Sequence, residues 1–371
     1  MRHWKRWAKR LAGTGAGRLL AADRASPRRD RTVPTLRSAL SFACATVLLC
    51  AGPARANDSS AELSAGGLVL IRNLDVEMRS EDLFISTGEV RVRYVFHNAS
   101  DKPVSGLIAF PMPDITASEA NISIPTEDPV NILDFKTRVN GTPVRTNVEQ
   151  KVFVLGIDRT AMLLDQKVPL APHLQSTRTV LDALPRPLWD EWAKIGLARV
   201  DAYDVGQGMK EHLEPQWTLK TTFYWMQTFP PKADTIIEHA YKPSVGASVG
   251  TTIGMATGDN AFLQREQRSY EQKFCMDRTF LSTVQAGVKK RKDGIAFSEE
   301  RIGYILTTGA NWSGPIGKFK LTVDKGAPNN LVSFCGTGVK KTGPTTFEMN
   351  ATDFYPTEDL SILILKPSPT P

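Results

Sequence analysis

Hydrophobic and polar residues alternate along much of this chain, most clearly between residues 90 and 110. Within 90–96 every second side chain is apolar, and Arg91 and Arg93 occupy the opposite face. A period of two residues over this length predicts a half-buried β-strand. Turn-forming residues follow at 97–103, and a second apolar run covers 104–110. The pattern therefore predicts two antiparallel strands joined by a turn.

The same alternation recurs in both halves of the chain. Asn140-Gly141 is a strong hairpin signal between alternating runs at 130–139 and 142–155. Residues 217–229 place large side chains on one face, and residues 235–241 return after a Pro-Pro turn. Further strands are predicted at 68–71, 74–78, 83–85, 302–307, 319–323, 331–334, 346–349 and 360–365.

Helical patterns are fewer and lie in three places. Ser59-Ser60-Ala61-Glu62 fits a capping box and predicts a short helical turn. Residues 157–214 change character and predict short helices at 158–166, 177–184 and 187–194, as an insertion over one end of a sheet. Asp277 is a suitable N-cap for a helix over 278–290, which ends in basic residues as helix C-termini favour.

These elements predict a mainly β (α+β) fold class. We expect an antiparallel β-sandwich over 57–255 with a helical insertion at about 157–214. A second β segment carrying one helix is expected over 256–366, followed by a disordered tail at 367–371. The pattern leaves open whether the two β segments share one sheet.

The charge of the chain is unevenly distributed. The formal net charge is +7, but residues 1–56 hold twelve of the 46 Lys and Arg residues and two of the 39 acidic ones. Residues 57–371 hold 34 basic and 37 acidic residues. The basic character therefore belongs to the N-terminal leader, and no nucleic-acid partner is expected.

The leader has the features of an export signal. The apolar run at 38–50 is too short to span a membrane as a helix, and Ala54-Arg55-Ala56 follows it. These features predict a signal peptide with an extended n-region over 1–56, cleaved after Ala56, and a periplasmic or secreted location. The alternatives are an N-terminal membrane anchor or a twin-arginine signal at Arg28-Arg29, and a translation start at Val33 would explain the long n-region. No transmembrane segment is expected in the mature chain.

Cys275 and Cys335 are the two cysteines that follow the predicted cleavage site. Exported proteins with two cysteines usually pair them, so a disulfide that closes a loop of about 60 residues is predicted. The alternative is two buried free thiols. A catalytic cysteine is not expected, because neither cysteine lies in a nucleophile motif.

Catalytic, cofactor and metal motifs are missing from the sequence. None of His97, His173, His212 and His239 has a second ligand at zinc spacing. The sequence has no phosphate-binding loop in the mature chain and no Gly-x-Ser-x-Gly motif. We therefore assign no catalytic residue, no metal site and no cofactor from the sequence.

Two pairs of residues are candidate ligand contacts. Trp189 and Trp192 lie three residues apart on one predicted helix face, where they form either an aromatic platform or ordinary core packing. Asn311 and Trp312 lie in a Gly-rich stretch that either binds a small ligand or connects two strands. For an enzymatic role, His239 and Glu238 are the first candidates, through a perturbed pKa or a paired carboxylate.

Several linked segments carry a resemblance to a known family. They include VRVRYVFHNASDKPV, IAFPMPDI, TFYWMQTFP, YILTTGANWSGPIGKFKLTVDKG and DFYPTEDLSILIL. Together they resemble the domain of unknown function 4424, a group of secreted bacterial proteins with no established activity. A more distant likeness to vault-inter-α-trypsin domains rests on the strand, turn, strand and Phe-Pro-x-Pro exit. The resemblance implies export and supplies no catalytic residues.

The sequence thus predicts an exported, envelope-associated protein that acts as a non-enzymatic binding or interaction module. Its expected partner is an envelope protein or a small ligand. The alternative is a hydrolase of cell-envelope polymers whose catalytic residues come together from distant positions.

Overall fold

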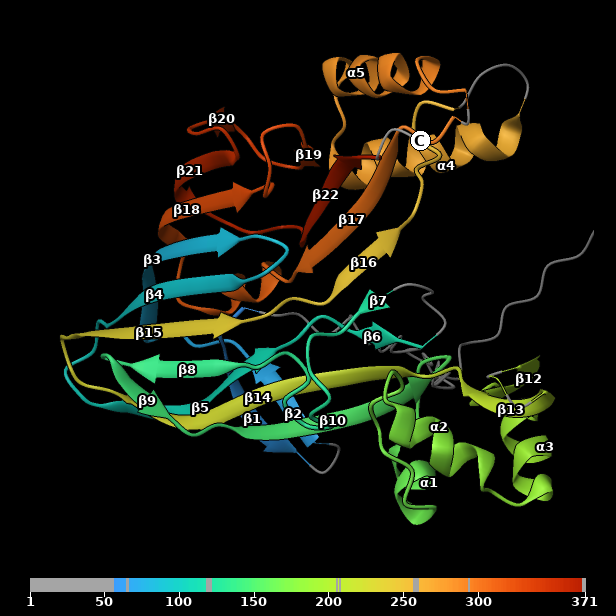
Figure 1. Cartoon of the computed structure of the whole chain (residues 1–371). Helices are drawn as coiled ribbons and strands as arrows, with labels where there is room; N and C mark the ends of the chain where they lie inside the picture. Colours follow the sequence, from blue (N-terminus) through green and yellow to red (C-terminus); the bar gives the residue numbers. More distant parts are fainter. Residues whose placement is uncertain are drawn as a thin grey trace, which may run out of the picture. The chain divides into compact units, whose positions relative to one another are not determined.

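The computed structural model describes residues 57–64, 67–117, 122–204, 206, 208–255, 260–292 and 294–368. Within these ranges most strands belong to three sheets, and helices are fewer (Figure 1). The mainly β (α+β) fold class is confirmed. The predicted signal peptide and most of the predicted tail lie outside the described residues.

The eight-stranded sheet has the order β20-β21-β18-β3-β4-β15-β8-β9. β18 runs parallel to β3, whereas the other neighbours in this sheet are antiparallel. Strands from both predicted β segments therefore share one sheet. Its members are β3 (Val76–Ile85), β4 (Val90–Asn98), β8 (Lys136–Val139), β9 (Thr142–Val144), β15 (Asp234–Tyr241), β18 (Ile316–Asp324), β20 (Lys340–Lys341) and β21 (Thr346–Phe354).

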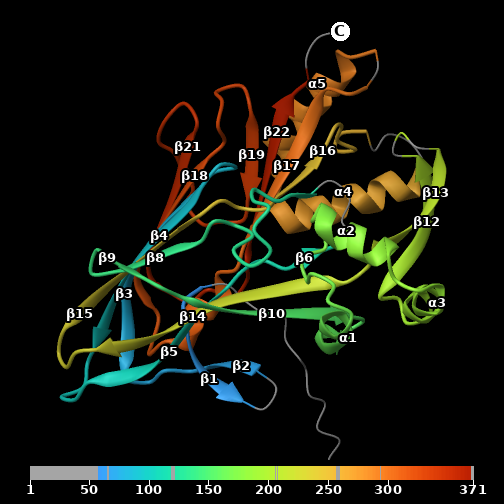
Figure 2. The same ribbon diagram turned by 60° about the horizontal axis from the view of Figure 1, so that its bottom comes forward.

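The seven-stranded sheet has the order β11-β10-β14-β5-β1-β2, with β6 also paired to β14. β10 and β14 run side by side in both ribbon views (Figure 2). The strands are β1 (Ser59–Ser64), β2 (Gly67–Ile71), β5 (Val104–Pro111), β6 (Ile115–Thr116), β10 (Asn147–Val154), β11 (Ile157–Asp158) and β14 (Thr218–Phe229).

The five-stranded sheet has the order β19-β22-β17-β16-β7. It consists mostly of C-terminal strands, and its β17–β22 pair is the longest ladder. The strands are β7 (Ile122–Ser123), β16 (Val245–Ser248), β17 (Phe297–Tyr304), β19 (Leu331–Phe334) and β22 (Leu360–Pro367).

The eight- and seven-stranded sheets bury their apolar faces in one core. Phe135, which precedes β8, stacks on Phe223 of β14 with ring centroids 4.4 Å apart, and Phe110 of β5 lies 5.1 Å from Phe135. The inward residues predicted for 90–96 and 217–225 are the buried ones. Burying large aromatic side chains dominates the energy of such a core, with about 2–3 kcal/mol for each.

The predicted pairing of residues 90–96 with 104–110 is wrong. β4 lies in the eight-stranded sheet and β5 in the seven-stranded sheet, so the turn carries the chain between sheets. Buried Asn98 holds this crossing, because its amide donates to the carbonyls of Lys102 at 2.8 Å and Phe229 at 3.0 Å. Alternation specifies which side of a strand is buried, but both strands face the same core, so it does not specify the partner.

The Asn140-Gly141 hairpin is confirmed between β8 and β9. Both residues have positive φ, 48° and 78°, as a tight hairpin turn of this kind requires. The long return strand predicted over 142–155 is divided: β9 stays in the eight-stranded sheet, and β10 pairs with β14 in the other.

The predicted helical insertion contains three helices, α1 (Thr160–Asp165), α2 (Gln175–Asp182) and α3 (Arg186–Lys194). It also contains a hairpin that the sequence did not indicate, β12 (Ala198–Asp204) and β13 (Met209–Pro215). α2 contacts β13 and α3 contacts β12. The hairpin was missed because charged residues are interspersed along both strands and few of its side chains are buried, which removes the apolar alternation.

The helical turn predicted over 59–62 is wrong, because these residues belong to β1. Ser60 and Ala61 are buried and pair with both β2 and β5. Two neighbouring strands therefore override the local capping-box pattern.

The C-terminal part carries two helices where one was predicted: α4 (Ala261–Phe274) and α5 (Arg278–Lys289). Phe274 and Val284 pack with Leu363 and Leu365 of β22 in a second apolar core. The predicted Cys275–Cys335 disulfide is confirmed, with an S–S distance of 2.06 Å. A short 3-10 helix, η1 (Thr307–Asn311), precedes β18. No helix in the described ranges is long and apolar enough to cross a membrane.

Candidate functional site

The first described residues, Asn57 and Asp58, are fully buried. The η1 segment and the residue after it hold them in place. The Thr308 hydroxyl donates to the Asn57 carbonyl at 2.7 Å, and the Trp312 indole N–H donates to the Asp58 carbonyl at 2.7 Å. The Asn311 amide donates to the Ser59 hydroxyl oxygen at 2.9 Å. The Gly-rich stretch that was a candidate ligand loop thus binds a segment of this same chain.

The side chains of Asn57 and Asp58 join a buried polar cluster with Glu81, His239 and two tyrosines, Tyr94 and Tyr304. The Asn57 amide donates to Glu81 Oε2 at 3.1 Å, and the Tyr94 hydroxyl donates to Asn57 Oδ1. Asp58 Oδ1 lies 3.0 Å from His239 Nε2. Glu81 Oε1 and Asp58 Oδ2 have no hydrogen-bond partner among the described residues. The cluster therefore holds two carboxyl groups against one imidazole.

Burial dominates the electrostatics of this cluster. It raises the pKa of Glu81 from 4.5 to about 8; the Asn57 amide opposes this rise and the Asp58 charge adds to it. Burial also raises the pKa of Asp58, against the attraction of His239. A carboxyl group without a full set of partners in an apolar core favours its neutral form. Glu81 is therefore largely protonated at neutral pH as long as the peptide bond between Ala56 and Asn57 is intact.

In a chain whose Ala56–Asn57 peptide bond is intact, the free energy of unfolding is expected to fall by about 3 kcal/mol as the pH rises from 5 to 7. The cause is the titration of Glu81. Glu81 keeps its proton up to about pH 8 in the folded state, while the unfolded carboxyl releases it near 4.5. The folded state therefore binds more protons in this window, and stability falls as pH rises. Urea unfolding across the pH range measures the slope, and Glu81→Gln should reduce it, leaving the smaller part that comes from Asp58. An unchanged slope in the variant would contradict the assignment.

The sequence candidates His239 and Glu238 do not form one site. They are neighbours on β15 and point to opposite faces of the sheet, because side chains alternate along a strand. His239 lies in the buried cluster, whereas the Glu238 side chain is 40% exposed. The buried cluster is closed to substrates, so accessible chemistry has to be sought on the outer face of the sheet.

Charged side chains alternate in sign across that outer face. Register places Arg138 of β8 opposite Glu238 of β15, and Glu238 opposite Arg93 of β4. Asp82 of β3 and Lys320 of β18 continue the same row. Opposite charges in cross-strand positions stabilise a sheet by up to about 1 kcal/mol for each pair.

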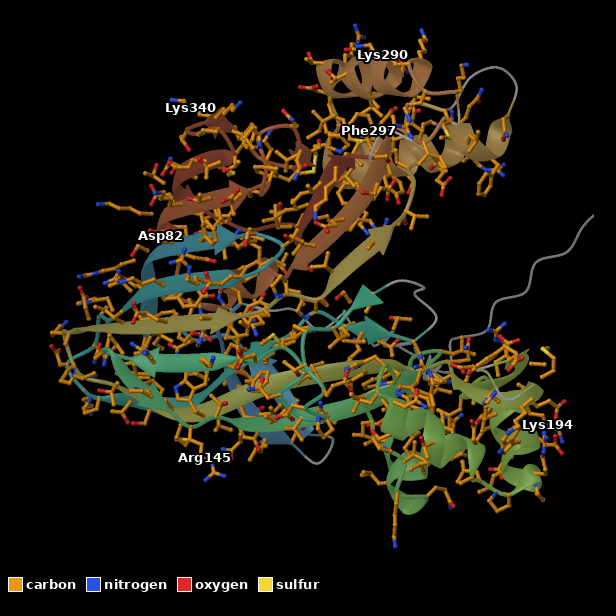
Figure 3. The ribbon with its side chains drawn as sticks, viewed as in Figure 1. Asp82, Arg145, Lys194, Lys290, Phe297 and Lys340 are labelled. Carbon is orange, nitrogen blue, oxygen red and sulfur yellow. A yellow bond between two sulfur atoms is a disulfide. The ribbon has the colours of Figure 1, made fainter. Side chains whose placement is uncertain are left out.

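The outer-face side chains described above are long. In the next row along the strands, one position carries a short side chain instead. Ala240 of β15 lies between Lys136 of β8 and Arg91 of β4. Its methyl group leaves a hollow of about 570 Å³, which we call the Ala240 hollow. Figure 3 labels Asp82, which lines it. The charged lining residues are Arg91, Arg93, Lys136, Arg138, Asp82 and Glu238.

The Ala240 hollow has more positive than negative charge. Three of its cations have an acidic neighbour: Arg91 with Glu89 at 3.0 Å, Arg93 with Glu238 at 3.8 Å, and Lys136 with Asp134 at 3.1 Å. Arg138 has no ion-pair partner within the described ranges. The paired side chains of Arg91, Arg93 and Lys136 are 57%, 47% and 70% exposed, so water competes with their ion pairs and the cations can turn to an anion above Ala240.

The model of the domain of unknown function DUF4424 matches residues 56–363. The chain belongs to the DUF4424 family. A search of the curated proteins gave no match. Among solved structures, the chain is similar to a proposed nutrient binding protein of Legionella pneumophila, with 17% identity, a TM-score of 0.41, and coverage of 84% of this chain and 70% of that one. The distant likeness to vault-inter-α-trypsin domains stays a prediction.

The four candidate ligand residues have packing roles in this DUF4424 protein. Trp189 and Trp192 of α3 are 4% and 1% exposed, so the insertion buries both rings. Trp312 is fully buried, and Asn311 holds Ser59 as described above. A ligand role for these side chains is therefore not part of our proposal.

A second hollow of this DUF4424 protein, of about 580 Å³, lies on the helical insertion and contains His212. Its imidazole Nδ1 is 2.7 Å from Asp182 Oδ2 and its ring stacks on Tyr203. This pair could not be predicted from a local pattern, because Asp182 of α2 and His212 of β13 are 30 residues apart in the chain. The other carboxylates there are paired as well, Asp201 with Arg199 at 2.9 Å and Glu214 with Arg178 at 3.5 Å. Across the described residues, no group of three or more His, Cys, Asp and Glu side chains could hold a metal ion.

Proposed function

We propose that this protein is an exported, envelope-associated binding module that holds an anionic ligand in the Ala240 hollow. The observation that carries the proposal is the group of four cations, Arg91, Arg93, Lys136 and Arg138, around a single small side chain. Export is supported by the signal-peptide pattern of residues 1–56 and by the disulfide, which persists in oxidising compartments. The ligand class is a carboxylate or phosphate.

The local charge differs from that of the rest of the chain. Residues 57–371 hold slightly more acidic than basic residues, 37 against 34. The lining of the Ala240 hollow has four cations and two carboxylates, a surplus of two positive charges. The guanidinium groups of Arg91, Arg93 and Arg138 suit anions with two or three oxygens, because each can donate two parallel hydrogen bonds. A volume of about 570 Å³ fits a small ligand or one end of a larger one.

The second candidate function is a hydrolase, and the hollow at His212 is the observation that favours it. The Asp182 carboxylate contacts the His212 ring in the way that a carboxylate orients a histidine general base in a hydrolase. The described lining residues include no Ser, Thr or Cys nucleophile, and each carboxylate there already has a cationic or imidazole partner. Binding at the Ala240 hollow therefore has more support than turnover at His212.

Binding of tripolyphosphate to the mature protein at low salt tests the proposed function. We expect Arg138→Gln to weaken the affinity by about tenfold, because one unpaired cation is removed. Ala240→Phe should weaken it by at least as much, because the ring fills the hollow without changing the charge. Isothermal titration calorimetry measures both affinities.

Arg145→Gln is the matched control. Arg145 is an exposed arginine in the connection between β9 and β10, and Figure 3 shows it well away from Asp82. Its replacement removes the same charge and should leave the affinity within twofold of the original. Equal affinities of all three variants and the original chain would refute a site at the Ala240 hollow.

A further inference from the structure

The buried polar cluster contains more acid than base. Glu81 and Asp58 are both at least 99% buried, and the His239 imidazole faces Asp58. Glu81 has no cationic partner in the described part of the chain: its Oε2 accepts from the Asn57 amide and its Oε1 is unpartnered. Asp58 Oδ2 is unpartnered too. Buried carboxyl oxygens without partners are rare in native proteins, and each calls for an explanation.

The residue beside these oxygens is the one that the predicted cleavage would make the first of the mature chain. The Asn57 amide nitrogen is 3.1 Å from Glu81 Oε2, and four covalent bonds separate that nitrogen from the Asn57 main-chain nitrogen. The main-chain nitrogen therefore lies within about 5 Å of the amide nitrogen that contacts Glu81. Asp58 is the next residue in the chain.

We propose that this cluster is a binding site for the chain's own new N-terminus: cleavage after Ala56 frees the α-ammonium group of Asn57, which pairs with the carboxylate of Glu81 and contacts Asp58. An ammonium group donates three hydrogen bonds, and the cluster has two carboxyl oxygens without donors. An amide N–H in a chain that continues to Ala56 carries no charge and one hydrogen, so it cannot satisfy both.

The charges balance without another reactant. Hydrolysis of the Ala56–Asn57 bond places the hydroxyl of water on the Ala56 carbonyl carbon and a hydrogen on the Asn57 nitrogen. The resulting amine takes up one proton from water, and the Glu81 carboxyl of the still unfolded chain releases one to water at neutral pH. Folding then brings the ammonium and the carboxylate side by side, and mutual attraction in the apolar interior stabilises both charged forms.

Cleavage precedes burial in this scheme, because Asn57 and Asp58 have no exposed surface in the folded chain. Insertion of the N-terminus is therefore a step of folding after export. The clamp formed by Thr308, Asn311 and Trp312 holds the inserted segment through its carbonyls and Ser59. The exported folded state is complete only when the leader has been removed at this bond.

The inference rests on the export proposed above but not on the Ala240 hollow, and its test uses no ligand. Two purified chains are compared, one beginning at Asn57 and one at Ala56, each with Glu81 and with Glu81→Gln. We expect the Asn57 chain to melt about 5–10 °C above the Ala56 chain. Glu81→Gln should lower the melting temperature of the Asn57 chain and leave that of the Ala56 chain equal or higher. The effect of Glu81→Gln on the melting temperature therefore differs between the two chains if Glu81 pairs with the N-terminus. It would be the same in both chains if Glu81 only packed in the core.

A chemical readout completes the test. In the folded Asn57 chain, the α-amine should react with an amine-acylating reagent at least tenfold more slowly than in the Ala56 chain, and Glu81→Gln should restore the rate. Glu77→Gln is the control: Glu77 also lies on β3, is exposed, and its replacement should leave both quantities unchanged. Equal melting temperatures and labelling rates for the two chains would overturn the proposal, and so would an exported protein whose first residue is not Asn57.

Discussion

Replacing His239 by Ala is expected to lower the free energy of unfolding by at least about 4 kcal/mol. The imidazole fills space among aromatic rings, with centroids 4.7 Å from Phe110 and 5.0 Å from Phe135. It is also the hydrogen-bond partner of Asp58 Oδ1. His239→Ala therefore creates a cavity and leaves a buried carboxyl group without its partner. Urea unfolding followed by tryptophan fluorescence measures the loss.

His97→Ala is the matched control, because His97 makes the same kind of pair near the surface. Its Nδ1 lies 2.7 Å from Asp234 Oδ1, and the Asp234 side chain is 46% exposed. Water can replace this contact, so the expected loss is about 1 kcal/mol or less. Removing Asp58 together with His239 should cost less than the sum of the two single changes. A His239→Ala variant as stable as His97→Ala would contradict the role of the buried pair.

The sequence predicted the faces of the strands better than their partners. Alternation at 90–96 and 217–225 identified the buried side chains correctly, because one side of each strand lies in an apolar core. It failed at the connection between β4 and β5, where a turn of ordinary composition crosses between sheets. The parallel pairing of β18 with β3 joins residues more than 230 positions apart. No local pattern contains information about such a pairing.

The missed elements have a common physical cause. α4 carries few apolar residues, and its inward positions Tyr270 and Phe274 lie one turn apart within a mostly polar segment. β1 has a local helix signal that pairing with two other strands overrides. In both cases tertiary contacts decide the structure, and weak local preferences follow them.

The candidate sites were only partly visible in the sequence. The alternation at 90–96 predicts that Arg91 and Arg93 lie on an outer face. The same alternation at 136–139 predicts that Lys136 and Arg138 lie on an outer face too. Residues 57–371 hold slightly more acidic than basic residues, so pairs of cations at alternate positions in two of their strands are a signal that could have identified the basic face. The gap at Ala240 could not be read from the sequence, because it depends on the register of β15 between β4 and β8.

Breaking the Cys275–Cys335 bond is expected to lower the free energy of unfolding by about 4 kcal/mol in the chain-entropy model, since it closes a loop of 60 residues. The bond ties the residue after α4 to the residue after β19, next to the second core of α4, α5 and β22. This core is much smaller than the one between the large sheets, so amide exchange after reduction should rise first in α4 and α5. Urea midpoints of Cys335→Ser and of the doubly substituted Cys275→Ser/Cys335→Ser chain should fall equally, because either change removes the same cross-link. Two titratable thiols in the native oxidised protein, or a midpoint that reduction does not shift, would contradict this role of the bond.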